Sequence, residues 1–280
     1  MKKVFIGAFA IGVCAILGYS YFSSYAEVEG YQTDIQAQPI EGITQNLSAL
    51  TWNPETRTLF ATINHPATVV ELSTDGKLLR KLEVDGIHDP EAIEHIEGNR
   101  YVIADERQRH LYEVEITPQT QRLNVSDAPG LRLDMDGRDG NSGFEGLAWN
   151  RADKHLLVAQ ERKPIKLFKI EGFPALSGVS NVEIKVTTGA SWMSSIGDIS
   201  SLDYDSEHKQ LLVMSEQSDK ILFISPEKSV KQLTLDGTKH GLKARIPQPE
   251  GMATDGHGHL YIVSEPNLFY RLTTNTPDGL

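Results

Sequence analysis

Short apolar runs alternate with polar turns along most of the chain, and the same pair of runs recurs five times. The first run of each repeat begins with NLSALTWN, DPEAIEHI, GFEGLAWN, DISSLDYD and QPEGMATD, at Asn46, Asp89, Gly143, Asp198 and Gln248. A second run follows about fifteen residues later and ends in ATIN, IADE, VAQE, VMSE and IVSE. Successive repeats begin 43, 54, 55 and 50 residues apart.

This periodicity predicts an all-β fold of the β-propeller type. A period of about 40–55 residues made of short strands is typical of propellers, in which each repeat forms one four-stranded antiparallel blade. In the first repeat we expect strands at Ser48–Trp52, Thr58–Ile63, Thr68–Leu72 and Leu78–Val84. Five repeats predict five blades. Six blades are the alternative, because the second and third repeats are long enough to contain additional strands.

The last repeat is short, which bears on how the ring closes. After Leu268–Leu272 only a polar tail remains, whereas Tyr31–Ile40 has the pattern of a strand and precedes the first repeat. We therefore expect Tyr31–Ile40 to complete the last blade, because this would hide the strand edges that an open array leaves exposed. The predicted domain spans residues 31–280, with residues 27–30 as a linker.

Residues 1–26 differ from the rest of the chain. Lys2 and Lys3 precede an uncharged, mostly apolar run of 19 residues, Val4–Phe22, and Ser24-Tyr25-Ala26 resembles a signal-peptidase site. The run approaches the length of a membrane-spanning helix. We expect one N-terminal hydrophobic helix that crosses the inner membrane at residues 4–22, with the propeller on the periplasmic side. The alternative is a soluble periplasmic protein cleaved after Ala26.

Composition narrows the classes of partner. The formal net charge is −11, which argues against nucleic acid and leaves cations, an unidentified small molecule or an envelope protein. The single cysteine, Cys14, lies in the N-terminal apolar run, so residues 31–280 contain neither a disulfide nor a thiol nucleophile. The sequence has no G-x-S-x-G elbow, P-loop or dinucleotide fingerprint.

Carboxylates recur at fixed positions of the repeat. The start of a blade's first strand and the end of its antiparallel second strand lie on the same face, so these positions should gather at one end of the central channel. The first-strand position is occupied by Ser48, Glu91, Glu145, Ser200 and Glu250. The position two residues earlier holds Asn46, Asp89, Gly143, Asp198 and Gln248. The second-strand position holds Asn64, Glu106, Glu161, Glu216 and Glu265. We refer to Glu91, Glu145 and Glu250 as the ring glutamates.

Gathered carboxylates raise each other's pKa unless positive charge lies among them. Three arrangements would relieve the repulsion: a bound cation, pairing with arginines and lysines such as Arg107, Arg109, Arg162 and Lys163, or protonation. We expect a divalent cation, with calcium as the ion because it takes six to eight oxygen ligands. The expected metal ligands are Glu91, Glu145, Glu250, Asp89 and Asp198. Further ligand contacts are expected from Asn46, Glu106, Glu161, Glu216, Glu265 and Arg245. The alternative is that the repeat carboxylates cap inter-blade loops by accepting hydrogen bonds from backbone N–H groups.

The repeat segments quoted above, with the closing segment PQPEGMATDGHGHLYIVSEPNLFYRL, resemble the SdiA-regulated propeller family, and within it the YjiK-like proteins, over essentially the whole chain. The resemblance implies an envelope-located β-propeller whose biochemical role is not established. The E-G-[LM]-A pieces at Glu145 and Glu250 also look like those of phytase-like esterase propellers, and calcium-dependent lactonase propellers place acidic residues in the channel. The chain departs from these enzymes at Ser48 and Ser200, which replace glutamate in two repeats, and it shows no lactonase histidine pair.

Two classes of function follow from these patterns. The first is a binding or scaffold module in which the cation is structural. The alternative is a metal-dependent hydrolase of a phosphoester or a lactone, in which the cation would polarise the substrate and a glutamate would act as base. The sequence assigns no catalytic residue.

Overall fold

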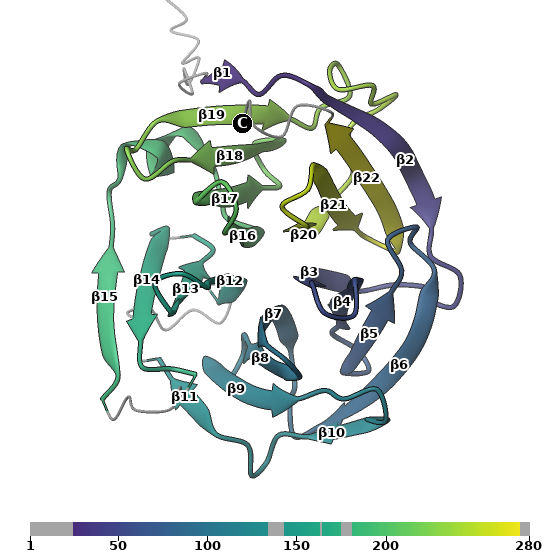
Figure 1. The fold of residues 1–280 in the computed structure, drawn as a ribbon, viewed down its shortest axis with the longest axis vertical. Helices are drawn as coiled ribbons and strands as arrows, with labels where there is room; N and C mark the ends of the chain where they lie inside the picture. Colours follow the sequence, from purple (N-terminus) through teal and green to yellow (C-terminus); the bar gives the residue numbers. More distant parts are fainter. Residues whose placement is uncertain (1–24, 134–142, 163, 175–180, 275–280) are drawn as a thin grey trace, which may run out of the picture.

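The computed structural model describes residues 25–133, 143–162, 164–174 and 181–274. The strands in these residues form five sheets arranged around a central axis (Figure 1). The five sheets confirm the predicted five-bladed β-propeller, and we number the blades 1 to 5 in the order of the sequence repeats. The apolar segment in which the N-terminal helix was expected lies outside the described residues.

Within each blade the strands follow one another from the axis outward. Blade 1 consists of β3 (Leu47–Asn53), β4 (Thr58–Ile63), β5 (Thr68–Leu72) and β6 (Leu78–Asp85). Blade 2 consists of β7 (Pro90–Glu97), β8 (Arg100–Asp105), β9 (His110–Glu115) and β11 (Gly130–Arg132). Blade 3 consists of β12 (Phe144–Asn150), β13 (His155–Gln160), β14 (Lys166–Glu171) and β15 (Glu183–Thr187). A 3₁₀ helix, η1 (Ser191–Ser195), leads to blade 4, which consists of β16 (Ser201–Asp205), β17 (Gln210–Ser215), β18 (Lys220–Ile224) and β19 (Val230–Thr234). Blade 5 consists of β20 (Pro249–Thr254), β21 (His259–Ser264), β22 (Leu268–Thr274) and, outermost, β2 (Tyr31–Pro39).

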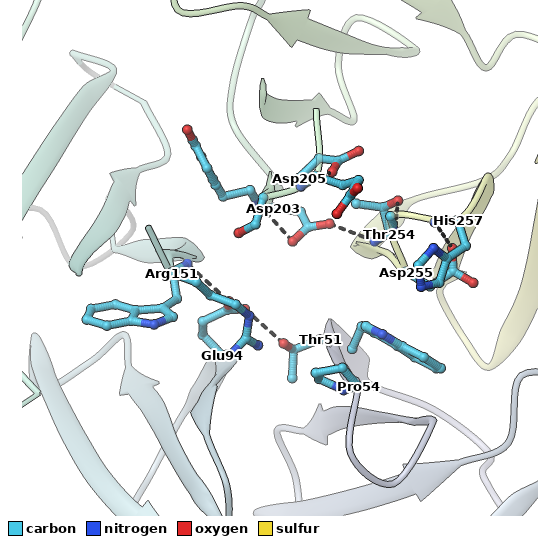
Figure 2. Close-up of a pocket in the computed structure, with 15 residues that line it drawn as sticks. Thr51, Pro54, Glu94, Arg151, Asp203, Asp205, Thr254, Asp255 and His257 are labelled. Atoms are coloured by element: carbon cyan, nitrogen blue, oxygen red, sulfur yellow. Dashed lines mark hydrogen bonds between the residues drawn. The ribbon is translucent and has the colours of Figure 1, made fainter. Parts of the chain in front are cut away.

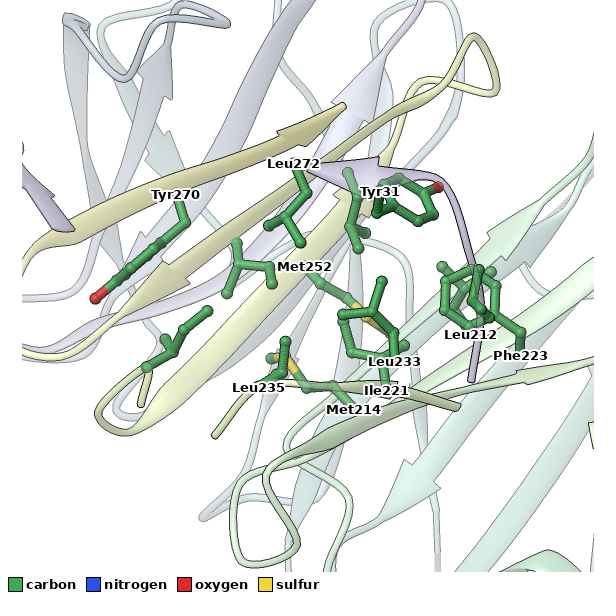
Figure 3. Packing of buried hydrophobic residues seen from close by; sticks show 14 of the residues in the cluster. Tyr31, Leu212, Met214, Ile221, Phe223, Leu233, Leu235, Met252, Tyr270 and Leu272 are labelled. Carbon is green, nitrogen blue, oxygen red and sulfur yellow. The ribbon is translucent and has the colours of Figure 1, made fainter. Parts of the chain in front are cut away.

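The ring closes through β2, as the sequence predicts. This strand pairs antiparallel with β22, from Tyr31 opposite Thr274 to Pro39 opposite Leu268. Tyr31 is 1% exposed and belongs to the apolar cluster between blades 4 and 5 (Figure 3). Its ring centroid lies 6.3 Å from that of Phe223 in β18. The closing strand therefore contributes both backbone pairing and a buried aromatic side chain.

Two blades carry a fifth, parallel strand that the sequence analysis did not predict. β10 (Arg122–Asn124) pairs with β6, and β1 (Ala26–Glu27) pairs with β19. Both additions cover the outer edge of a sheet, which would otherwise expose unpaired backbone groups. The connection between β9 and β11 of blade 2 and the segment before β2 thus contribute to the fold.

Residues 27–30, expected as a linker, are in part integrated into blade 4. Val28 is 1% exposed, and the carboxylate of Glu27 accepts hydrogen bonds from Thr234 N (2.7 Å), Lys239 Nζ (2.6 Å) and His240 Nε2 (2.8 Å). Burial disfavours the charged form of Glu27, but these hydrogen bonds outweigh it and lower the pKa to about 2. The partners are about 200 residues away in sequence, so no local pattern reveals the contact.

Neighbouring blades cover both faces of the middle strands. All six residues of β13 are buried, in keeping with the continuous apolar run at its centre. Five apolar clusters, one for each junction between adjacent blades, form the core. The inner strands can therefore bring polar residues to the axis while the core stays apolar.

Among the described residues, no helix is long and apolar enough to cross a membrane. This finding contradicts the predicted single-pass location in the inner membrane, because the described chain consists of strands and the five-residue helix η1. Residues 4–22, to which the prediction assigned the membrane anchor, lie outside the described residues.

Tyr31→Ala tests the contribution of the closing strand. The substitution should lower the free energy of unfolding by about 3–5 kcal/mol, the usual cost of deleting a buried aromatic side chain. Gln32→Ala, at an exposed position of the same strand, should change it by less than about 0.5 kcal/mol. Urea denaturation of both variants checks the prediction, and equal midpoints for the two would contradict the role of β2.

Candidate metal centre

The ring glutamates lie at irregularities of the inner strands. The pairing register shifts between Pro90 and Ala92 in β7, between Phe144 and Gly146 in β12, and between Pro249 and Gly251 in β20. In each case the residue passed over is the ring glutamate. A β-bulge leaves one residue out of the ladder and re-aims its side chain. The repeat therefore specifies a bulge as well as a carboxylate at this position.

The glycines after two of these glutamates allow adjacent inner strands to approach closely. A Cβ on Gly146 would lie 2.7 Å from Leu202 Cγ, and one on Gly251 would lie 2.3 Å from the carbonyl carbon of Ala49. Real Cβ contacts are longer than this, so a larger residue would push the inner strands apart. The glycine that follows Glu145 and Glu250 is therefore required by the close packing of the inner strands.

A recurrent backbone hydrogen bond shows that the predicted positions do gather at one face. In four blades the backbone N–H at the second-strand position donates a hydrogen bond to a backbone carbonyl. That carbonyl belongs to the residue that lies two positions before the first-strand position. The bonds are Asn64 N to Asn46 O (3.3 Å), Glu106 N to Asp89 O (3.0 Å), Glu161 N to Gly143 O (3.2 Å) and Glu265 N to Gln248 O (3.0 Å). The columns read from the sequence are therefore neighbours in space.

Three carboxylates converge closely enough to share an ion. Asp89, Glu91 and Glu106, all of them half-buried, each place one carboxylate oxygen within 4.8 Å of the others. Asn64 Nδ2 donates to Glu91 Oε1 (2.5 Å), and Asn64 Oδ1 is buried with no hydrogen-bond partner among the described residues. The atoms that could bind a metal here, the three carboxylate oxygens and Asn64 Oδ1, are all oxygens. Oxygen ligands suit calcium or magnesium better than zinc or copper.

Several acidic groups of this face have cationic partners, among them Asp89 of the cluster itself. The ion pairs join Arg107 Nη2 to Asp89 Oδ2 (3.2 Å), Arg162 Nε to Glu161 Oε2 (2.9 Å), Arg245 Nη2 to Glu216 Oε1 (3.4 Å) and Arg245 Nε to Asp219 Oδ1 (2.5 Å). Arg245, expected to contact a ligand, thus lies against two carboxylates of blade 4. Internal pairing accounts for the outer charges of this face.

Two predicted site residues also act as loop caps. Asp198 is 3% exposed, and its Oδ1 accepts hydrogen bonds from Ser215 Oγ (2.5 Å) and Gln217 N (3.1 Å). Glu106 Oε1 accepts one from Gly143 N (3.1 Å). A Cβ at residue 143 would lie 1.6 Å from Glu106 Cγ, so only glycine admits Glu106 here.

The ring glutamates have raised pKa values because they are buried close to other carboxylates. In the part of the chain that the structure describes, no lysine or arginine forms an ion pair with any of them. Burial raises the pKa of Glu91 to about 7, and the charges of Glu106 and other carboxylates act in the same direction. A hydrogen bond from Ser48 opposes this shift. Burial and the charges of Glu91 and Glu265 raise the pKa of Glu250 to about 8. Burial and neighbouring carboxylates also raise the pKa of Glu145 well above its usual value. Glu145 and Glu250 are close enough to the cluster to feel its charge.

The opposite end of the channel was not predicted from the sequence. A cavity of about 190 Å³ lies there, lined by one or more inner-strand residues of every blade, including Thr51, Glu94, Trp149, Asp203 and Thr254 (Figure 2). A signal was present, since Glu94 and Asp203 interrupt the apolar inner strands within AIEHI and SLDYD.

Comparison with known proteins identifies relatives by sequence and by fold. The sequence model of the SdiA-regulated family matches residues 24–273, which confirms the resemblance; the narrower likeness to YjiK-like proteins stays a prediction. A luciferin-regenerating enzyme is similar in structure, with a TM-score of 0.52 and 16% identity, over 84% of this chain and 93% of that one. A chain of a nidogen/laminin complex has a TM-score of 0.50 and 13% identity, over 79% of this chain and 73% of that one. A protein of unknown function from Bacteroides thetaiotaomicron has a TM-score of 0.51 and 10% identity, over 87% and 75%. At these identities the likeness shows the fold alone.

The raised pKa values predict that, with chelator present, stability falls as pH rises. A carboxyl whose pKa is about 8 in the folded chain and near 4.5 in the unfolded chain binds more protons when folded, so its contribution is present below pH 4.5 and lost through pH 8. Glu250→Gln removes this loss. The variant should melt near the wild type at pH 5 and several degrees above it at pH 8.5. A constant difference between the two melting temperatures across this range would contradict the raised pKa.

Proposed function

The chain belongs to the SdiA-regulated family, and we propose that it is a binding module whose acidic channel end holds a divalent cation, with calcium as the ion. The observation that carries the proposal is the convergence of Asp89, Glu91 and Glu106, with carboxylate oxygens within 4.8 Å of one another. Glu145 and Glu250 add negative charge around the cluster. The buried, partnerless Asn64 Oδ1 offers a neutral oxygen beside Glu91.

The contrast between outer and inner carboxylates supports a cation. Arginines pair with Glu161, Glu216 and Asp219 and also with Asp89, whereas among the described residues no arginine or lysine forms an ion pair with a ring glutamate. Without an ion, Glu91, with a pKa of about 7, and Glu250, with a pKa of about 8, retain protons in part near neutral pH. A divalent cation would replace the protons and convert mutual repulsion into attraction.

Millimolar calcium should therefore stabilise the chain. A ligand that binds only the folded state adds about 2.7 kcal/mol at a hundredfold excess over its Kd. For a chain of this size that is roughly 5–10 °C, at about 2–4 °C per kcal/mol. Glu91→Gln should abolish most of this shift and weaken calcium binding in isothermal titration calorimetry.

Glu216→Gln is the matched control, because Glu216 occupies the repeat position of Glu106 but pairs with Arg245 (3.4 Å). It should keep the calcium response of the wild type. If neither calcium nor magnesium moves the melting curve of the wild type, the cluster is a protonated structural network and the cation is ruled out.

A metal-dependent hydrolase is the second candidate, favoured by one observation. Glu91 and Glu250 have pKa values of about 7 and 8, the range in which a carboxyl serves as general acid or base near neutral pH. The luciferin-regenerating enzyme has a related fold, but the identity is too low to transfer an activity. This function would require a cation held mainly by Asp89, Glu91 and Glu106, with Glu250 left to handle a proton.

Turnover assays separate the two candidates. A hydrolase should cleave p-nitrophenyl phosphate or a γ-lactone only with calcium present, and Glu250→Gln should lower kcat about a hundredfold, within the range for loss of a general acid or base. A calcium-stabilised chain that hydrolyses neither compound is the binding module.

A further inference from the structure

The cavity at the opposite end of the channel has the features of a separate binding site. It has a volume of about 190 Å³ and is walled by side chains from the inner strands of all five blades and from the turns that follow them. Glu94 in β7 and Asp203 in β16 point toward the same space from blades 2 and 4 (Figure 2). Neither the ring glutamates nor the residues around them line it.

Hydrogen bonds hold both carboxylates in place. Glu94 accepts from Thr51 Oγ1 (2.8 Å) and from Trp149 N (3.0 Å). Asp203 accepts from Thr254 N (2.6 Å) and from Tyr204 N (2.8 Å). Each carboxylate oxygen uses one lone pair in this way and keeps a second for a ligand. Glu94 is buried, whereas Asp203 is only half-buried and so lies closer to the open space.

The titratable groups facing the cavity are mostly carboxyls, and burial raises the pKa of Glu94 to about 7 and that of Asp203 well above its usual value. Asp205 at the end of β16, and Glu207 and Asp255 in the turns, add three carboxyls to the lining, and Arg151 is the one arginine or lysine among the lining residues. The guanidinium of Arg151 donates to His95 Nδ1 (2.9 Å) and to the backbone carbonyl of Ile96. It offsets part of the charge of Glu94 but is held at the wall, so a negative excess remains.

The form of the site favours an organic cation over a metal ion. Among the described residues, the metal-ligating groups of the cavity do not converge as those of Asp89, Glu91 and Glu106 do. Their separation leaves room for a ligand of several atoms. Trp52 lines the same space and is fixed by stacking on Tyr261, with ring centroids 6.0 Å apart. Aromatic faces beside carboxylates attract ammonium groups.

A polar atom without a partner also lies in the lining. The hydroxyl oxygen of Ser206 is buried and has no hydrogen-bond partner among the described residues. A buried polar group in this state costs free energy unless a ligand or water satisfies it. Ser206 is thus a residue of the cavity wall whose hydroxyl group the described fold leaves unsatisfied.

We propose that this cavity binds a small organic cation carrying a primary ammonium group, with Asp203 and Glu94 as its anionic contacts and Trp52 as its aromatic wall. The ammonium would donate hydrogen bonds to the carboxylate oxygens, while its alkyl part contacts the indole ring of Trp52. This site is independent of the calcium site proposed above, since the two share no residue.

The test titrates the full chain with 1,4-diaminobutane, using calorimetry and tryptophan fluorescence at low ionic strength and pH 7.5. We expect saturable 1:1 binding and a fluorescence change, because two of the three tryptophans line the cavity. The neutral isostere 1,4-butanediol should not bind. Asp203→Asn should weaken binding by at least about tenfold, as expected for loss of a charge-assisted hydrogen bond.

Asp127→Asn is the matched control, because it removes one negative charge from an exposed position away from the cavity and should leave the affinity unchanged. Trp52→Phe, which keeps an aromatic ring on Tyr261, should lower the affinity even if Asp203→Asn fails to fold. Equal binding of the diamine and the diol, unchanged affinity in Trp52→Phe, or absence of binding at millimolar diamine would overturn the proposal. A calcium titration of the same samples reports on the other site separately.

Discussion

The antiparallel pairing of β2 with β22 is the constraint on which the other features of the molecule depend. Closing the ring places each repeat at a fixed rotation from the next, so the residues at one repeat position must converge on one axis. Convergence is harmless for apolar residues, which form the five clusters between blades. For carboxylates it concentrates like charge in a half-buried channel. An open array of the same blades would have neither the cavity nor the acidic cluster.

The fold relieves this repulsion in different ways at different distances from the axis. Outer carboxylates such as Glu161 and Glu216 meet arginines that follow them in sequence or reach over from a neighbouring connection. Asp198 is buried and stabilised by a hydroxyl and a backbone N–H. The ring glutamates form no ion pair with an arginine or lysine among the described residues, and the hydrogen bonds that Glu91 accepts from Ser48 and Asn64 do not offset its burial. Their raised pKa values record the balance between burial and charge. Their charge is therefore the part of the face that responds to pH and, in our proposal, to a cation.

The features that recur in every repeat could be predicted from the sequence, whereas contacts between segments far apart in the sequence could not. Two middle strands of blade 1, Thr58–Ile63 and Thr68–Leu72, match the prediction residue for residue, because apolar period and turn chemistry are local. The convergence of the three carboxylate columns followed from the same period. The parallel strand β1, the Glu27 contacts and the pairing of Arg245 with Asp219 depend on segments far apart in sequence, so no local pattern specifies them. The second channel end was missed because Glu94 and Asp203 are not repeated in the other blades.

The departures from the repeat decide where on the ring the chemistry lies. Blade 1 has Ser48 where blades 2, 3 and 5 have glutamates, and Asn64 where all the other blades do, and both are neutral neighbours of Glu91. Blade 3 has Gly143 where blades 2 and 4 have aspartates, and its missing side chain admits Glu106. A fully regular ring would spread its charge evenly over five blades and offer no preferred position. The substitutions on either side of blade 2 instead leave Asp89, Glu91 and Glu106 together, so the repeat sets the face and its irregularities set the site.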